Sequence, residues 1–519
     1  MRSVRRRCLR ALMTRRVGPS RRPAPRKEAP TMVNETQPRS PGSAPDSVAS
    51  HDYRQRIRDH RAATGRRTAV LDDDPTGSQS VHGVSVVTVI DAAEFETALS
   101  EPESTCFILT NSRSLDEADA AALNRRAGTM LFELESKLGV TLDVVSRSDS
   151  TLRGHVIAEV QALDAARREV TGHGFDGVLL VPSYFEAGRF TAGDVHWATI
   201  GGEPVPTGRT EFARDATFGY EASDLKDFVA EKSAGAISAD QVLSVSLDDI
   251  RSGGIDRVAD IFCSARNLQF IVVNATDFSD LEIVVLGLQA AQRAGKAFLH
   301  RSGPSFVRAL TGLEPQDTLT AADIWPAGRP AGHGLIVVGS HVGQTGRQMA
   351  VAQLRGGVTE IEVPVSVLVD RGQRDPAVAD ITRRVVAALA DSDVLLYTSR
   401  SLMKGADAAA SLDIARTISA AVIDVVRGAL VAEPAWVIAK GGITSHDVAV
   451  RGLGIRRATV IGQLFPGMVS VLRPEEATEG VAGMPYVVFA GNVGDENALA
   501  DTIELFRGPG ASAPAGVSA

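Results

Sequence analysis

The hydrophobic pattern of the chain repeats one unit, in which a short apolar run, often β-branched, ends in a loop rich in Gly, Ser, Thr, Asp and Arg. Short apolar runs that alternate with amphipathic stretches indicate the buried strands and the helices of βα units. In the first half, the predicted strands are 68–71, 106–110, 142–146, 177–181 and 270–274. The segments 117–138 and 155–170 carry Ala, Leu, Glu and Arg at amphipathic spacing and are predicted helices.

The same pattern resumes after a segment with several Pro and Gly residues, 303–334, which we interpret as a linker between domains. The predicted strands beyond it are 335–339, 394–398, 436–439 and 486–490. We therefore expect an α/β protein of two doubly wound lobes, 65–302 and 335–508, with mainly parallel sheets and a cleft between the lobes. Ligands of such sheets bind beyond the carboxyl ends of the strands, which is where the polar loops fall.

The two ends of the chain have a different composition. Residues 1–27 contain ten arginines, one lysine and no acidic residue, and a Pro- and Ser-rich stretch follows. Because such a composition cannot form a core, we interpret 1–50 as a disordered basic extension and 509–519 as a disordered tail. An initiation site assigned too early, with Met32 as the true start, fits this interpretation. An Arg-rich targeting peptide is the alternative.

Composition narrows the class of protein. Of the 519 residues, 44% are hydrophobic and 23% are charged, which is typical of a globular enzyme, and the net charge of -8 gives no reason to expect nucleic acid as a partner. No apolar run is long enough to span a membrane. Cys8, Cys106 and Cys263 are too few for a disulfide framework, so we expect a cytoplasmic location. A homo-oligomer is compatible with these features.

Several common motifs are missing from the sequence. It contains no GxxxxGK[ST], no GxGxxG after a strand and no HExxH. P-loop, dinucleotide-binding and zincin sites are therefore not expected. The histidines show no regular ligand spacing, so we predict no residue as a metal ligand.

Three carboxylates, Asp72, Asp73 and Asp74, follow the first predicted strand and precede Pro-Thr-Gly. Adjacent carboxylates repel one another, and such crowding can raise the proton affinity of one of them enough for a catalytic base. The glycine that follows lets a ligand approach the backbone closely. We therefore predict Asp73 and Asp74 as catalytic candidates. The alternative is a solvated acidic turn.

The loop after the third predicted strand, Ser-Asp-Ser-Thr-Leu-Arg-Gly, combines an acid, hydroxyls and a guanidinium. A planar guanidinium binds a carboxylate through two parallel hydrogen bonds, so Arg153 is suited to the carboxylate of a polyol acid. Asp149, Ser150 and Arg113 of the neighbouring loop are suited to its hydroxyls or to another carboxylate oxygen. The alternative is a helix N-cap formed by Ser150 or Thr151, with a surface salt bridge.

Glycine-rich loops mark the second lobe. The run Gly441-Gly442-Ile443-Thr444-Ser445 lies at a strand-to-helix junction, where backbone N–H groups and two hydroxyls face an anion. The loop from Ser340 to Gly346 and the run Gly491-Asn492-Val493-Gly494 add two walls of small residues. Together the three loops predict a phosphate or nucleotide site, although single glycines at such turns also occur for packing reasons.

These motifs resemble those of the four-carbon acid sugar kinase family over nearly all of residues 65–508. The run Asp73-Asp74-Pro75-Thr76-Gly77-Ser78 is similar to the family's Asp-Asp-x-Thr-Gly-Ala signature. The run Asp149-Ser150-Thr151-Leu152-Arg153-Gly154 is similar to its Asp-Ser-Thr-x-Arg-Gly signature. Pro182, with Arg189 and Thr191 after it, resembles a third N-terminal block, and Tyr184 in that loop is a further substrate-binding candidate.

In the second lobe, Lys440-Gly441-Gly442-Ile443-Thr444 resembles the family's Gly-Gly-acid-Thr nucleotide loop, and Gly491-Asn492-Val493-Gly494 resembles its Gly-Asn-x-Gly loop. The resemblance implies transfer of the γ-phosphate of ATP, with Mg²⁺, to the terminal hydroxyl of a tetronate or oxo-tetronate. The ATP-binding residues that it implies are Ser340, Gly441, Gly442, Thr444, Gly491 and Asn492.

The sequence also departs from the family pattern. Ile443 replaces the usual acidic residue, and Pro75 and the tripled aspartate differ from the commoner form. We interpret these departures as marks of a divergent branch whose acid is not fixed by the resemblance. Two alternatives stay open, a nicotinamide-dependent sugar-acid oxidoreductase and a non-catalytic sugar-acid-binding protein, for which Ile443 is the hint.

Overall fold

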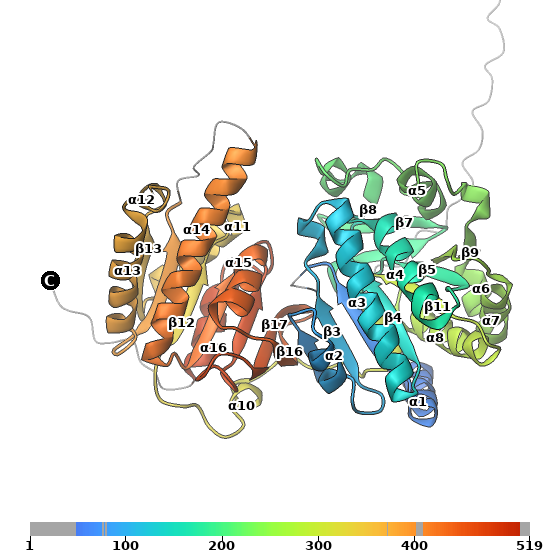
Figure 1. Ribbon diagram of the computed structural model, residues 1–519, viewed down its shortest axis with the longest axis horizontal. Coiled ribbons are helices and arrows are strands. Elements are labelled where there is room, and N and C mark those ends of the chain that lie inside the picture. Colours follow the sequence, from blue (N-terminus) through green and yellow to red (C-terminus); the bar gives the residue numbers. More distant parts are fainter. Residues whose placement is uncertain (1–47, 75–76, 78–79, 371, 401–407, 509–519) are drawn as a thin grey trace, which may run out of the picture. The chain divides into compact units, whose positions relative to one another are not determined.

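The computed structural model describes residues 48–508 apart from 75–76, 78–79, 371 and 401–407 (Figure 1). These residues fall within one compact unit of the chain. The predictions for residues 1–47 and 509–519 lie outside the described residues, as do Pro75, Thr76 and Ser78 of the acidic loop.

The described residues contain a sheet of 15 strands, and the half formed by the first lobe is parallel throughout. In sheet order, the strands of this half are β2 (Val84–Val87), β3 (Thr105–Leu109), β1 (Arg67–Asp72), β4 (Leu142–Arg147), β11 (Phe298–Ser302), β5 (Gly177–Val181), β10 (Gln269–Val273) and β9 (Leu243–Val245). The polar ends of β1, β3, β4 and β5 therefore lie at one edge of the sheet, as predicted.

The other half of the sheet is mainly parallel and ends in a hairpin. In sheet order, its strands are β13 (Val358–Val363), β14 (Asp393–Thr398), β12 (Gly334–Val338), β15 (Trp436–Lys440), β18 (Tyr486–Phe489), β17 (Met468–Glu476) and β16 (Arg457–Phe465). β16 pairs antiparallel with β2, so that Arg457 lies opposite Val87. This single pairing makes the sheet continuous from one lobe to the other.

Helices flank both halves of the sheet (Figure 1). Those before residue 312 are α1 (Val48–Thr64), α2 (Ala92–Ala98), α3 (Glu117–Leu138), α4 (Val156–Thr171), α5 (Leu225–Lys232), α6 (Leu247–Arg251), α7 (Gly254–Ser264), α8 (Phe278–Arg293) and α9 (Pro304–Thr311). The later helices are α10 (Ala321–Ile324), α11 (Gly343–Arg355), α12 (Val365–Leu368), α13 (Arg374–Ala388), α14 (Ala408–Ala429), α15 (Gly442–Asp447) and α16 (Ala498–Arg507). A separate three-stranded sheet contains β6 (Arg189–Ala192), β7 (Val195–Ile200) and β8 (Glu203–Pro206).

The strands of the large sheet are buried on both faces, which is why they appear in the sequence as continuous apolar runs. On β1, Val70 belongs to a core that includes residues of α7 and α8, whereas Leu71 belongs to a core that includes residues of α3 and α4. On β12, Val337 and Val338 divide in the same way between the α13–α14 side and the α11–α16 side. The predicted α/β class with two doubly wound lobes is confirmed.

The predicted strands are all present, with ends within one residue of those observed, and so are the helices α3 and α4. β11 was missed because His300 and Arg301 interrupt its apolar run, yet both side chains are buried. The hairpin β16–β17 and the small sheet β6–β8 were also missed. No described helix is long and apolar enough to cross a membrane.

Two helices lie outside the segments from which the lobes were predicted. In α1, Ile57 is buried in the core, and Arg54 forms an ion pair of 3.1 Å with Glu282 of α8. In α9, which begins just after residue 303, Phe306 and Val307 are fully buried. The first lobe therefore also includes a helix that precedes its predicted segment in the sequence and one that follows it.

Candidate functional site

The carboxylates that end β1 are held in a buried network. Asp72 is fully buried and pairs with Arg147 of β4, with 2.8 Å between Oδ1 and Nη1. A Cβ atom on Gly77 would lie 1.5 Å from Oδ2 of Asp72, so only glycine fits beside this carboxylate. Burial raises the pKa of Asp72 to about 7, although Arg147 opposes the rise. The solvated acidic turn is therefore wrong for Asp72.

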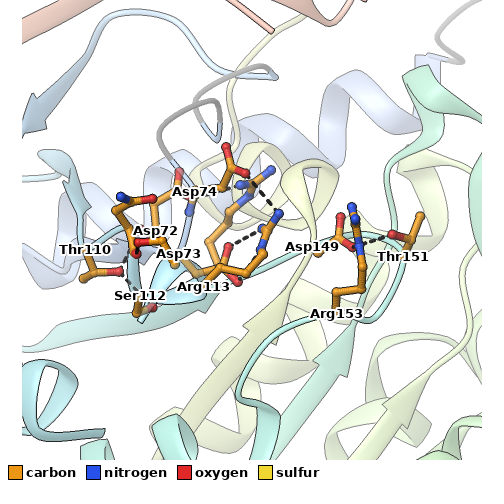
Figure 2. Close-up of polar contacts among 12 residues, drawn as sticks. Asp72, Asp73, Asp74, Thr110, Ser112, Arg113, Asp149, Thr151 and Arg153 are labelled. Carbon is orange, nitrogen blue, oxygen red and sulfur yellow. Dashed lines mark hydrogen bonds and ion pairs between the residues drawn. The ribbon is translucent and has the colours of Figure 1, made fainter. Parts of the chain in front are cut away.

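Arg113, in the turn that follows β3, joins the other two aspartates (Figure 2). Its Nε lies 3.2 Å from Asp73 Oδ2, and its Nη1 lies 3.0 Å from Asp74 Oδ2. The side chain of Asp73 is 2% exposed and that of Asp74 is 28% exposed, so only Asp74 offers an accessible oxygen. Burial raises the pKa of Asp73, against the opposing effect of Arg113. The structure thus brings together three predicted site residues.

A second buried ion pair interacts electrostatically with Asp73. Arg301 of β11 forms a buried ion pair with Glu159 of α4 and donates to Ser146 Oγ at 2.7 Å. Ser112 donates to the other oxygen of Glu159 at 2.5 Å. Sequence reasoning missed Glu159 and Arg301, because a glutamate in an amphipathic helix and an arginine after an apolar run both appear as surface residues. The only sequence feature that could have indicated them is position, since Glu159 lies one turn into its helix and Arg301 lies at a strand end.

Figure 2 shows the Asp149 loop, with Thr151 and Arg153, beside Asp73 and Arg113. Arg153 Nε donates to Asp149 Oδ2 at 2.6 Å, and Thr151 donates to the same oxygen. Burial pushes the pKa of Asp149 upward, but the guanidiniums of Arg113 and Arg153 outweigh it and hold this pKa well below its usual range. The carboxylate of Asp149 therefore stays charged between two arginines.

Neither Ser150 nor Thr151 caps the helix that follows, because the N-cap residue of α4 is His155, whose side chain makes no cap hydrogen bond. Instead the carbonyl of Ser150 accepts a hydrogen bond of 2.8 Å from Nε2 of His196, a buried residue of β7. Burial lowers the pKa of His196 to about 4, so this imidazole is neutral at pH 7. The N-cap interpretation is wrong, and the loop is held by tertiary contacts.

Tyr184, in the loop after β5, is buried, and its hydroxyl donates to the carbonyl of Gly467 in the β16–β17 turn. Burial raises the pKa of Tyr184 above its usual range. The structure thus places this predicted substrate contact where the first lobe meets the hairpin of the second.

All six predicted ATP-binding residues line one pocket, which has a volume of about 550 Å³. They are Ser340, Gly441, Gly442, Thr444, Gly491 and Asn492. Asp74, Asn111, Arg113 and Ser114 of the first lobe line the same pocket. The other predicted substrate residues, Asp149, Ser150, Arg153 and Tyr184, are not among its lining residues.

The glycines of this pocket allow close packing of its three loops. A Cβ on Gly491 would lie 2.5 Å from Ser340 Oγ, and one on Gly441 would lie 3.2 Å from Ser340 Cβ. Gly441 also has φ +125°, a conformation that other residues rarely adopt. The loops therefore present backbone amides and two hydroxyls, rather than bulky side chains, to a ligand.

Two residues next to the Gly-Gly pair differ in exposure. Lys440, directly before the pair, is buried and does not line the pocket, and its Nζ donates to the carbonyl of Ala490 at 2.8 Å. Burial lowers the pKa of Lys440 to about 7. Ile443, by contrast, lines the pocket with 72% of its surface exposed. No group of three or more His, Cys, Asp or Glu side chains within the described ranges is arranged to hold a metal ion.

Comparison with protein families assigns both halves of the chain. Residues 68–310 match the model of a sugar-binding N-terminal domain, and residues 335–499 match that of a nucleotide-binding C-terminal domain. The chain belongs to the four-carbon acid sugar kinase family. The resemblance inferred from the motifs is thereby confirmed, and this family member has a sugar-binding and a nucleotide-binding domain. No curated protein matches the chain.

Solved structures share the fold of this family member. A Haemophilus influenzae protein of the DUF1537 family superposes with a TM-score of 0.57 at 17% identity, covering 84% of this chain and 99% of that one. A Salmonella typhimurium LT2 protein provisionally called a tRNA synthase superposes with a TM-score of 0.61 at 16% identity, covering 83% and 98%. At these identities the likeness concerns the fold alone.

A third solved structure is a DUF1537 protein of Bordetella bronchiseptica, determined as a domain-swapped dimer with bound citrate. It has 21% identity and covers 85% of this chain and 98% of its own, but its TM-score is 0.34.

Proposed function

We propose that the protein is an ATP-dependent kinase that phosphorylates the terminal hydroxyl of a small sugar acid, a tetronate or an oxo-tetronate. The observation that carries the proposal is the shared pocket, in which Asp74 and Arg113 of the sugar-binding domain face the glycine loops of the nucleotide-binding domain. Phosphoryl transfer requires mainly that the two reactants be positioned and their charge neutralised. A pocket lined by residues of both domains can meet both requirements, the positioning and the neutralisation of charge.

Asp74 is the proposed proton acceptor. Its carboxylate lines the pocket, whereas Asp73 is buried behind Arg113. Asp73 then has a positioning role, because it holds the guanidinium of Arg113 in place. From there Arg113 is able to offset charge on the phosphoryl group as it moves.

The phosphates of ATP would lie against Gly441, Gly442 and Thr444, with Ser340, Gly491 and Asn492 forming the remaining walls. Apart from Asp74, the oxygen-bearing side chains of this pocket are neutral, which fits a Mg²⁺ ion held mainly by phosphate oxygens with Asn492 as a protein ligand. Such an ion supplies neutralisation of the phosphate charge. Arg153, Asp149, Ser150 and Tyr184 would bind the sugar acid.

An ADP-release assay with four- and five-carbon sugar acids tests the proposal. We expect Asp74→Asn to lower kcat by about 10²- to 10⁴-fold, the usual contribution of a general base, and Arg153→Ala to raise KM for the acid. Asp317→Asn, which changes an exposed aspartate outside the pocket, should leave turnover unchanged. Full turnover by both Asp74→Asn and Arg153→Ala would show that the assignment is wrong.

Thermal-shift measurements separate the alternatives. Stabilisation by ATP with Mg²⁺ but not by NAD is expected for a kinase, and the reverse would favour a sugar-acid oxidoreductase. A non-catalytic sugar-acid-binding protein would be stabilised by the acid and release no ADP. We also infer a cytoplasmic location, which cell fractionation would test.

A further inference from the structure

Arg189 is the first residue of β6 and lies at the end of a tight loop after β5. Its backbone N–H donates to the carbonyl of Tyr184 at 2.9 Å, and Tyr184 N–H donates back to Arg189 at 2.9 Å. Gly188, with φ +69°, allows the turn between them. The backbone of Arg189 is therefore fixed at the same edge of the sheet as the acidic loops.

The guanidinium of Arg189 lies between two aromatic rings. Its Cζ is 5.8 Å from the ring centroid of Tyr184 and 5.6 Å from that of Phe212, in the 3₁₀ turn Glu211–Arg214. Its Nε is buried and has no hydrogen-bond partner. Across residues 48–508 with their stated gaps, the side chain of Arg189 makes neither a hydrogen bond nor an ion pair.

The neighbouring arginines differ from Arg189 in this respect. Arg147 pairs with Asp72, Arg301 pairs with Glu159, and Arg113 pairs with two aspartates. Leaving a largely buried cation without an anionic partner is costly in free energy. An anionic ligand would remove that cost.

Arg153 provides a second guanidinium at the same place. Its Cζ is 5.7 Å from the ring centroid of Phe212, the ring that Arg189 also contacts. Its Nε is used by Asp149, and its Nη1 lies 3.8 Å from Asp215, so part of the group is left for a ligand. The side chain of Arg153 is 29% exposed, which gives a ligand access.

We propose that Arg189, together with Arg153, binds the carboxylate of the sugar acid. The inference rests on the proposed function, which supplies the sugar acid. The sequence suggested Arg113 for a further carboxylate oxygen of the acid. Arg189 takes this role instead, because the nitrogens of Arg113 are already directed at Asp73 and Asp74. Asp149 interacts electrostatically with Arg113, Arg153 and Arg189.

This assignment orients the substrate. The carboxylate end lies at Arg189, the hydroxyls pass Asp149, and the terminal hydroxyl reaches Asp74 beside the nucleotide pocket. The planar forks of two arginines recognise a carboxylate by paired hydrogen bonds, which a neutral hydroxymethyl group cannot reproduce. The arrangement therefore selects acids over the corresponding polyols.

Calorimetric titration with erythronate and threonate, each compared with its polyol, erythritol or threitol, tests the proposal on the full chain. We expect Arg189→Met to weaken binding of the acid by about 10- to 100-fold, the range for losing a charge-assisted hydrogen bond, while ATP–Mg affinity is unchanged. Arg189→Lys, which keeps the charge but lacks the fork, should give a smaller loss. Arg209→Met, at an exposed arginine nearby, should have no effect.

Two results would overturn the inference. In the first, Arg189→Met and Arg189→Lys bind the acid as tightly as the wild type does. In the second, the variants lose as much affinity for the polyol as for the acid. Retained ATP–Mg binding shows that a variant is folded. Acid binding that depends on Arg189 without ADP release would refute the kinase proposal and leave the carboxylate site intact. ADP release that does not depend on Arg189 would refute the carboxylate site and leave the kinase proposal intact.

Discussion

At the residue scale, the first lobe holds its charged side chains in place by pairing them with one another. Asp72 with Arg147 and Glu159 with Arg301 are buried pairs, and removing one partner of such a pair leaves a charge without compensation. Arg113 connects this interior to the accessible carboxylate of Asp74. The site is therefore organised before any ligand binds.

His196 makes this organisation sensitive to acid. Its pKa is lowered from 6.5 to about 4 by burial, so below pH 6.5 the unfolded chain binds a proton that the native protein does not. Stability should therefore fall as pH decreases from 6.5 to 4. At pH 5 this one group lowers the free energy of unfolding by about 2 kcal/mol.

Urea unfolding at pH 7.5 and pH 5 measures this effect. His196→Gln, whose amide can still donate to the Ser150 carbonyl, should lose less stability between the two pH values than the wild type. His173→Gln, at an exposed histidine, should behave like the wild type. An identical pH dependence in His196→Gln and the wild type would contradict the prediction.

At the element scale, the strands and the loops were predictable to different extents. Apolar runs such as 177–181 predict strands well, because a parallel strand is buried on both faces. The run 298–302 was not predicted, because Arg301 is buried through Glu159 and Ser146, which are distant in sequence. Likewise, Arg189 was seen only as part of a motif, since nothing local shows that Phe212 lies against it.

The glycine loops of the nucleotide-binding domain give the prediction at this scale. Gly491 does not have a positive φ, but a Cβ there would lie 2.5 Å from Ser340 Oγ and would push two pocket walls apart. Overpacking of this kind typically costs about 1–3 kcal/mol. We therefore expect Gly491→Ala to weaken ATP–Mg binding by roughly 5- to 100-fold.

Calorimetry with ATP–Mg checks this expectation, and Gly346→Ala is the matched control. A Cβ on Gly346 of α11 would come no closer than 3.7 Å to its nearest neighbour, Arg400, so the pocket should be unaffected. Sugar-acid binding should be unchanged in both variants. Equal ATP–Mg affinity in Gly491→Ala and Gly346→Ala would mean that close loop packing does not shape the nucleotide site.

At the scale of the whole molecule, the two domains share one sheet through the antiparallel pair β2–β16. Side chains reinforce this pairing. Glu94 of α2 accepts from Arg457 of β16 at 2.6 Å and from the neighbouring Arg456 at 2.9 Å. Tyr184 bonds to the β16–β17 turn as well. The sugar-binding and nucleotide-binding domains are thus coupled by backbone hydrogen bonds, and a linker alone does not join them.

This coupling predicts how the protein unfolds. Thr88, directly after β2, donates its backbone N–H to the carbonyl of Arg456 at 3.0 Å, so a proline at this position removes a hydrogen bond that joins the domains. We expect one calorimetric transition for the wild type and for Thr88→Ala, which keeps the backbone donor. Thr88→Pro should show two transitions, of which ATP–Mg shifts only one. A single transition in Thr88→Pro, at the midpoint of Thr88→Ala, would show that cooperativity between the domains does not depend on the shared sheet.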